Sequence, residues 1–248
     1  MRTVYILWLR QLKRFIRKKA NIVGALGQPA LFLFALGFGL SPIFARAGGG
    51  NYIQFLAPGV IAMTVLFTAV FTGLEVIWDK QFGFLKETLV APVPRYQILL
   101  GKTLGGATVA VIQGILVFFI TLLTGFRPES WLLMPIALVF LILIACLFSA
   151  LGTAIAARLE DMQSFPLIMN FVIQPLFFLS GALFPLHQLP QALELITKIN
   201  PLSYGVESLR WALTGQSYIS PVVCLVVLTI VTGALVVIGS DQFSRVEV

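Results

Sequence analysis

The stretch from Ser130 to Ala157, SWLLMPIALVFLILIACLFSALGTAIAA, contains no Asp, Glu, Lys or Arg. One helical crossing of a bilayer needs about 20 apolar residues, because roughly 30 Å of hydrocarbon is covered at about 1.5 Å per residue. The stretch also lacks the two-residue alternation of a membrane barrel strand. It therefore predicts a membrane-spanning helix.

Further stretches of the same character lie on both sides of it. The 248-residue chain is 58% hydrophobic and 11% charged, whereas soluble domains contain about 45–50% apolar and about 25% charged residues. We predict an all-α integral membrane protein whose single transmembrane domain, 1–248, has six spans. Their expected ranges are 22–44, 55–77, 103–125, 131–156, 165–186 and 219–239.

Lys and Arg are distributed unevenly around these spans. With the N-terminus in the cytoplasm, the outer ends hold only Arg46, Arg127, Lys198 and Arg210, and all other basic residues lie inside. This positive-inside pattern predicts cytoplasmic N- and C-termini. The net charge of +7 then indicates membrane lipids as partners and not nucleic acid, which requires a basic domain facing water. Two cysteines and one histidine are too few ligands for a metal site of that type.

Residues 1–20 place Arg10, Lys13, Arg14 and Arg17 on one helical face, with apolar residues available to the other. This pattern predicts an amphipathic helix in the membrane plane. Two roles remain open for it: a topology anchor that binds anionic headgroups, or a contact with a cytoplasmic partner as well.

The longest cytoplasmic connection is 79–97, DKQFGFLKETLVAPVPRYQ, in which prolines stop any helix near the end. It is either a docking segment for a partner or a plain linker, and its apolar residues favour docking. Just before it, Glu75 is either an interfacial residue or a shallow intramembrane acid, and the neighbouring Trp78 favours the interface.

Gly101-Lys102-Thr103 matches the end of a phosphate-binding P-loop. The first glycine of that motif would fall on Tyr96, and the segment enters a membrane helix instead of a strand-to-helix turn. We therefore expect no nucleotide site here, and we expect Gly101 and Gly105 to allow close helix packing.

The fifth span contains Pro166, Pro175 and Pro185 and two amides, Asn170 and Gln174, at i and i+4. We expect a kinked helix whose amides face inward, either as contacts between helices or as lining of a translocation path.

The segment 187–215 that follows the fifth span is too charged to cross the membrane and too apolar for a simple loop. It predicts two short interfacial or re-entrant helices on the outer side, the second capped by Asn200, with Pro201 in its first turn, and ended by Gly215.

The order of these features is similar to that of permease subunits of ABC-2-type exporters. The resemblance covers nearly the whole chain and is carried by the basic start, the six spans, FLKETLVAPVPRYQILLGK after the second span and NPLSYGVESLRWALTG before the last. It implies a multi-pass half-transporter in a bacterial plasma membrane, in which two copies of this chain assemble with two copies of a separate ATPase. The cargo would be an amphiphilic, drug-like, lipid-linked or glycolipid or polysaccharide molecule that is moved outward.

The resemblance also implies roles for particular residues. Phe82, Phe84, Leu85, Lys86, Glu87 and Leu89 would couple to the ATPase. Asn170, Gln174, Phe177 and Phe178 would face the path between subunits. His187, Tyr204, Glu207 and Arg210 would shape an outer gate. The chain would not be an enzyme and would bind no cofactor, since the partner would bind ATP and Mg.

Two other function classes are weighed against the exporter. A non-transporting scaffold or a passive channel would show the same spans, although the docking segment argues against it. A lipid-modifying enzyme at the outer leaflet would use His187 with Glu194 or Glu207 as acid and base, but these groups lack the spacing of a nucleophile and its base.

Overall fold

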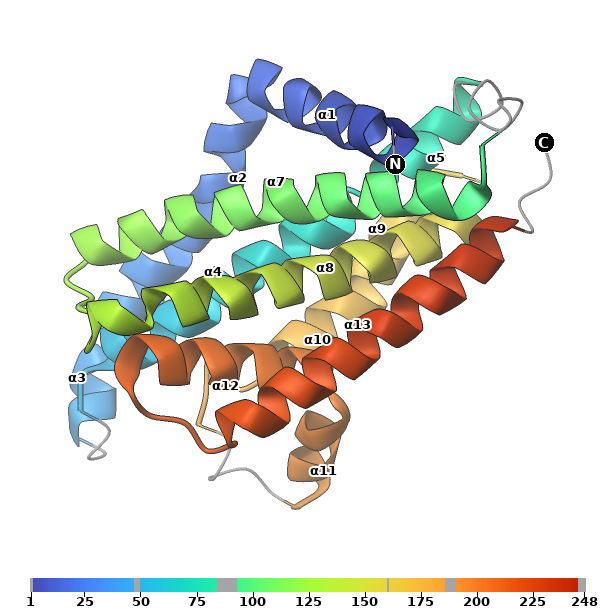
Figure 1. Ribbon diagram of the computed structural model, residues 1–248. Coiled ribbons are helices and arrows are strands. Elements are labelled where there is room, and N and C mark those ends of the chain that lie inside the picture. The colour runs from blue at the N-terminus through green and yellow to red at the C-terminus, as the bar shows by residue number, and fades with distance from the viewer. Residues whose placement is uncertain (1, 47–49, 84–92, 160, 186–190, 245–248) are drawn as a thin grey trace.

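The computed structural model describes residues 2–46, 50–83, 93–159, 161–185 and 191–244, and every regular element within these ranges is a helix (Figure 1). The all-α prediction is therefore confirmed. The elements are α1 (Arg2–Arg17), α2 (Lys19–Leu31), η1 (Phe32–Phe38), α3 (Gly39–Arg46), α4 (Tyr52–Phe71), α5 (Leu74–Gln81), α7 (Arg95–Leu123), η2 (Trp131–Leu133), α8 (Met134–Arg158), α9 (Ser164–Ile168), η3 (Met169–Ile173), α10 (Gln174–Phe178), α11 (Gln191–Ile199), α12 (Pro201–Thr214) and α13 (Pro221–Ser244).

Five helical stretches among the described residues are long and apolar enough to cross a membrane. They are Ile22–Arg46, Tyr52–Gln81, Arg95–Leu123, Trp131–Arg158 and Pro221–Gln242. The remaining predicted span, 165–186, is helical only from Ser164 to Phe178. That length is about 23 Å at about 1.5 Å per residue, which is less than the roughly 30 Å of a hydrocarbon core.

The helical segment Ser164–Phe178 ends at a turn formed by Ser180 and Gly181. The Ser180 hydroxyl donates to the carbonyl oxygen of Phe177 at 2.6 Å, and Gly181 follows with φ of 76°, a value that glycine adopts without steric cost. Proline at positions 166 and 175 and the π-helical turn η3 further interrupt its regular hydrogen bonding. Continuous apolar character alone therefore overstates the helix length here.

The chain nevertheless passes from one end of the bundle to the other through α9, η3 and α10. At the end of α8, the Leu159 carbonyl accepts from Lys80 Nζ of α5 at 3.3 Å. Beyond α10, the Leu183 carbonyl accepts from the Tyr52 hydroxyl at the start of α4, at 3.1 Å. The start of α1 and the end of α13 both lie at the α5 end of the bundle (Figure 1).

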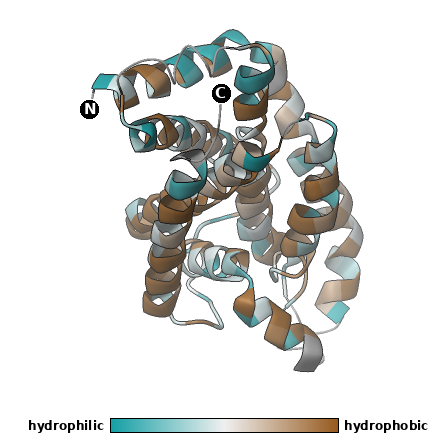
Figure 2. Ribbon diagram, turned by 90° about the vertical axis from the view of Figure 1, so that its right-hand side faces the viewer, coloured by the Kyte–Doolittle hydropathy of each residue, from teal (hydrophilic) through white to brown (hydrophobic). Residues whose placement is uncertain are grey.

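The core of the bundle is α4. In its apolar stretch 72% of the residues are buried, against 17% in both the first and the last candidate span. Residues of α4 lie between α7, α8 and α12, so an apolar side chain is accommodated on every face. Hydrophilic residues gather at the end that carries α1, and hydrophobic ones cover the long helices (Figure 2).

Glycines set the closest helix approaches. A Cβ on Gly152 of α8 would lie 2.7 Å from the carbonyl oxygen of Val70 in α4. In α7, a Cβ on Gly101 would lie 2.8 Å from the Leu7 Cβ, and one on Gly105 would lie 2.9 Å from the Gln11 Cβ, both in α1. The prediction that Gly101 and Gly105 permit close packing is confirmed, and their partner is the N-terminal helix.

We expect Gly152→Ala to lower the thermal unfolding midpoint of the purified protein, because the added methyl group meets the rigid backbone of α4. Overpacking of this kind costs about 1–3 kcal/mol. The measurement is thermal unfolding in mild detergent.

The matched control for this change is Gly27→Ala, because a Cβ at Gly27 meets nothing within 4 Å. Its midpoint should stay unchanged or rise, since alanine favours helix over glycine by about 1 kcal/mol. Equal losses in the two variants would contradict the packing argument.

Candidate functional site

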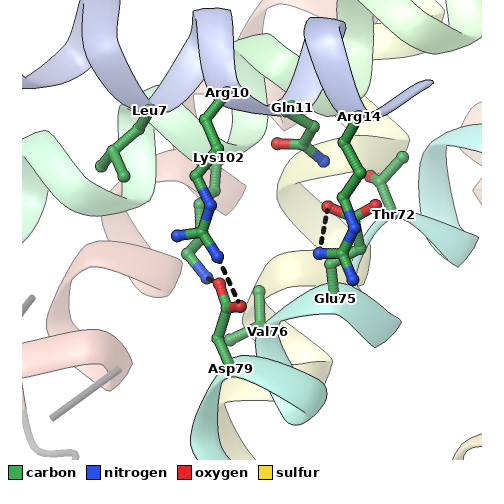
Figure 3. Close-up of a pocket in the computed structure, with 9 residues that line it drawn as sticks. All are labelled: Leu7, Arg10, Gln11, Arg14, Thr72, Glu75, Val76, Asp79 and Lys102. Atoms are coloured by element: carbon green, nitrogen blue, oxygen red, sulfur yellow. Dashed lines mark hydrogen bonds and ion pairs between the residues drawn. The ribbon is translucent and has the colours of Figure 1, made fainter. Parts of the chain in front are cut away.

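The candidate site lies where α5 begins after a break in α4 at Thr72 and Gly73. Glu75 and Asp79 are four residues apart and share one face of α5. Arg10 and Arg14 share a face of α1 in the same way, and Figure 3 shows them extending toward the two carboxylates. Two amphipathic helices therefore face each other through charged groups of opposite sign.

Asp79 is the centre of this arrangement. Its Oδ2 accepts from Lys102 Nζ of α7 at 2.6 Å, and its Oδ1 accepts from Arg10 Nη2 at 3.0 Å. Both Asp79 and Lys102 are buried. A third and longer ion pair joins Arg14 to Glu75 at 3.7 Å. We call Arg10, Arg14, Glu75, Asp79 and Lys102 the charge cluster.

The ion pairs of the charge cluster differ in energetic weight. The side chains of Arg14 and Glu75 remain 30% and 37% exposed, so solvent screens them and such a pair contributes about 0–1 kcal/mol. The Lys102–Asp79 pair is buried, and removing one partner of a buried pair typically costs about 3–5 kcal/mol. Of these ion pairs, the one between Lys102 and Asp79 is therefore the most costly to break.

A cavity of about 20 Å³ lies inside the charge cluster, and Gln11 and Thr72 complete its polar lining (Figure 3). This space is sufficient for about one water molecule. Polar groups in the cluster can therefore exchange hydrogen bonds through a water without opening the helix packing.

Other contacts hold α5 from the opposite side. Lys80 Nζ donates to the carbonyl oxygens of Ala157 and Leu159 at the C-terminal end of α8, where a cation satisfies unpaired carbonyls and the helix dipole. The Trp78 ring lies 5.9 Å from the Arg14 guanidinium. As a result, α5 is joined to three neighbouring helices along its two turns.

The predicted ATPase-coupling residues begin directly after α5. Phe82 follows the helix and is 67% exposed. Phe84, Leu85, Lys86, Glu87 and Leu89 lie outside the described residues. Glu75 faces Arg14 at the edge of the charge cluster, and 37% of its side chain is exposed.

The four residues predicted to line a path do not share one face. Asn170 and Phe178 are exposed, Gln174 is half-buried, and Phe177 is buried. The Phe177 ring packs edge-on against Phe32 at 6.0 Å, inside the subunit. The π-helical turn η3 has a different residue spacing from an α-helix, and it shifts the alignment expected for positions i and i+4.

The predicted outer-gate residues lie at the other end of the bundle, except His187, which is outside the described residues. Glu207 and Arg210 form a buried ion pair within α12. Arg210 Nη2 also donates to the Gly181 carbonyl at 2.9 Å, and its guanidinium lies 4.2 Å from the Phe55 ring centre. Burial lowers the pKa of Arg210, and the charge of Glu207 opposes that shift.

The remaining contacts at this end tie α12 to its neighbours. The second oxygen of Glu207 accepts from the Tyr218 backbone N–H at 2.7 Å, and the Tyr204 hydroxyl donates to the Lys198 carbonyl at 2.7 Å. Asn200 caps α12 by accepting from the Leu202 N–H, and Gly215 ends it in the left-handed conformation. Both of these end signals were predicted and are confirmed.

Sequence reasoning missed the charge cluster as a unit, although it weighed Glu75 and placed Arg10 and Arg14 on one helical face. Two sequence signals pointed to the other members of the cluster, Asp79 and Lys102. Asp79 repeats Glu75 four residues later, and Lys102 is the only charged residue between Arg95 and Leu123 of α7 after its first position. The pairing itself joins positions 23 and 69 residues apart, so local patterns do not reveal it.

The architecture is that of a helical integral membrane protein. Residues 2–214 match the family model of the ABC-2 type transporter, and the chain belongs to this family. It is therefore the transmembrane permease subunit of an ATP-driven exporter. Family permeases have no ATPase domain of their own and pair with ATPase subunits.

Individual relatives agree with this assignment. The chain is 30% identical over 199 residues to Nodulation protein J of Rhizobium leguminosarum bv. viciae, covering 79% of this chain and 76% of the relative. It is 29% identical over 212 residues to the inner membrane transport permease YadH of Escherichia coli strain K12, covering 84% and 82%. A transport permease of Cyanophora paradoxa, ycf38, described as putative, is 29% identical over 225 residues, covering 87% and 76%.

We expect Asp79→Asn to lower the free energy of unfolding by about 3–5 kcal/mol, because it leaves Lys102 buried beside Arg10 without a negative charge. Glu75→Gln is the matched control on the same helix and should cost about 0–1 kcal/mol. Unfolding in a denaturing detergent titration measures both.

The double variant Asp79→Asn with Lys102→Met should recover part of the lost stability, because it removes both charges of the buried pair. Equal losses for Asp79→Asn and Glu75→Gln, or no recovery in the double variant, would show that Asp79 is not the main link.

Proposed function

We propose that two copies of this permease assemble with two copies of its ATPase in the inner membrane of a bacterium and move an amphiphilic cargo outward. Cytoplasmic termini and a cytoplasmic charge cluster follow from the positive-inside pattern. The cargo class is drug-like, lipid-linked or a glycolipid or polysaccharide. The proposal rests chiefly on the charge cluster, which fixes α5 directly before the predicted docking segment.

In this proposal α5 transmits movement from the ATPase to the bundle. ATP and Mg bind to the ATPase, and its closure pushes the segment from Phe82 to Leu89. Because α5 is bound to α1 and α7 through Asp79 and to α8 through Lys80, these helices respond together as a rigid body. A flexible linker would lose the displacement before it reached the membrane helices.

The second copy covers the exposed face formed around α9, η3 and α10. Asn170 is exposed there beside Phe171, which is 78% exposed. The neighbouring η1 presents Phe34 and Phe38, and η1 contacts α10 through the Phe32–Phe177 ring pair. A polar amide facing lipid is costly, so a path between two subunits gives it a polar environment and gives the cargo aromatic surfaces.

The alternatives receive less support from the described residues. A scaffold or passive channel does not require α5 to be anchored on both sides. A lipid-modifying enzyme with Glu207 as its base is disfavoured, because one oxygen of Glu207 binds Arg210 and the other accepts from the Tyr218 N–H. The alternative base, Glu194, pairs with Lys198. The anchoring of α5 and the contacts of Glu207 therefore both favour the exporter.

We expect Phe82→Asp combined with Leu85→Asp to release the ATPase during co-purification in mild detergent, because two buried charges would oppose an apolar docking contact. The wild-type chain should retain one ATPase subunit for each permease chain. ATP turnover of the purified complex provides the second readout.

The matched control is Leu195→Asp combined with Ile199→Asp in α11, which replaces two exposed apolar residues at the other end of the bundle. It should retain the ATPase. If the wild-type chain binds no ATPase under any condition, the coupling proposal fails and the scaffold or channel becomes the better explanation.

We expect Asn170→Ala combined with Gln174→Ala to reduce export of amphiphilic dyes from proteoliposomes severalfold while the subunits still cross-link as dimers. Thr229→Val in α13, an exposed polar position on another helix, is the control and should export normally. Normal export together with weaker dimer formation would instead assign the two amides to subunit assembly.

A further inference from the structure

A groove of about 690 Å³ runs between α1 and α5, beside the charge cluster. Its volume falls within the roughly 300–1,000 Å³ that ligand pockets occupy. Five basic residues line it, against the single acid Asp79. The groove therefore has both the size and the charge to hold an anionic ligand.

Part of this positive charge is not neutralised by a carboxylate within the described residues. Arg10 pairs with Asp79 and Arg14 pairs with Glu75. Lys13, Arg17 and Lys18 have no ion-pair partner among the residues that the structure describes. They converge along the last turns of α1 and the start of the next helix, where they create a concentrated positive potential at the groove.

The rest of the lining is apolar and also accessible. Ile6 of α1 is 54% exposed, and Leu9 and Phe82 complete the wall. Trp78 borders the groove, and its ring lies 5.9 Å from the Lys18 ammonium. Its indole N–H is buried and has no hydrogen-bond partner among the described residues. A small inorganic anion would leave this apolar wall uncovered, whereas an amphiphile covers it.

We propose that the groove binds one anionic phospholipid, with its headgroup phosphate held by Lys13, Arg17 and Lys18 and its glycerol and upper acyl region against Ile6 and Leu9. The placement suits a membrane surface, because Trp and amphipathic helices concentrate at headgroup level. Basic residues at that level attract anionic lipids. This site is separate from the cargo path and goes beyond the proposed export function.

The bound lipid contributes to the rigidity of α5. A phosphate between the end of α1 and Trp78 neutralises cations that otherwise repel one another beside Arg10 and Arg14. It therefore relieves the repulsion among the basic residues at the end of α1 and favours the position of α1 beside α5. The permease then responds to the anionic lipid content of its membrane through the same helix that precedes the docking segment.

The test uses the purified full chain and dioleoyl phosphatidylglycerol as probe, with retained lipid counted by native mass spectrometry. We expect the wild-type chain to keep one phosphatidylglycerol and to unfold at a higher temperature with it than with dioleoyl phosphatidylcholine. Lys13→Gln combined with Arg17→Gln should weaken this binding roughly tenfold or more. Ile6→Ser should weaken it without any change of charge.

The matched control is Arg2→Gln combined with Lys19→Gln, which removes the same charge from exposed positions on α1 and α2 that do not line the groove. It should bind phosphatidylglycerol as the wild type does. Equal loss in both double variants would overturn the site in favour of general surface attraction. Circular dichroism and gel filtration confirm that each variant compared is folded.

Two further outcomes would also overturn the proposal. Competition by glycerol 3-phosphate as effective as that by the lipid would assign the groove to a soluble phosphate compound. Displacement of the lipid by the ATPase, with the Lys13 and Arg17 variant losing ATPase binding in phosphatidylcholine nanodiscs, would assign the groove to ATPase docking. In the first case the export proposal is untouched, and in the second it is strengthened.

Discussion

The packing of helices at one end of this permease depends on the ion pairs that the Asp79 carboxylate forms. Lys102 and Arg10 each donate to one of its oxygens, so a single buried group joins α5 to two other helices. Glycine at positions 101 and 105 brings α1 close enough to α7 for this arrangement. Moving α1 away would leave a buried carboxylate with one counter-charge fewer, which favours the packing of the amphipathic helix α1 on α7.

The far end of the bundle uses a buried ion pair differently. Glu207 and Arg210 lie within one helix, and their remaining groups reach the Gly181 carbonyl, the Phe55 ring and the Tyr218 backbone. These contacts hold α12 against the start of α4 at that end of the bundle. The Asp79 end instead encloses a water-sized cavity and borders an open groove. The helix before the docking segment therefore has open space beside it.

Much of the helical architecture could be predicted from sequence, because uninterrupted apolar runs and end signals such as Asn200 and Gly215 are local properties. The fifth span was predicted too long, since the turn at Ser180 and Gly181 and the π-helical turn depend on backbone geometry. For the same reason Phe177 lies inside the subunit instead of beside Asn170. The pairing of Lys102 with Asp79 required the packing of α1 on α7, which no local pattern contains.

The separation of Arg10 from Asp79 by 69 positions, and of Asp79 from Lys102 by 23, has a consequence for biosynthesis. A chain grows from its N-terminus, so α1 is complete well before α5 appears, and α5 well before α7. During that interval α1 lacks both its carboxylate and the glycine surface on which it packs. An amphipathic helix can lie at the membrane surface during that interval, and the glycine surface that α1 packs on exists only once α7 has been made.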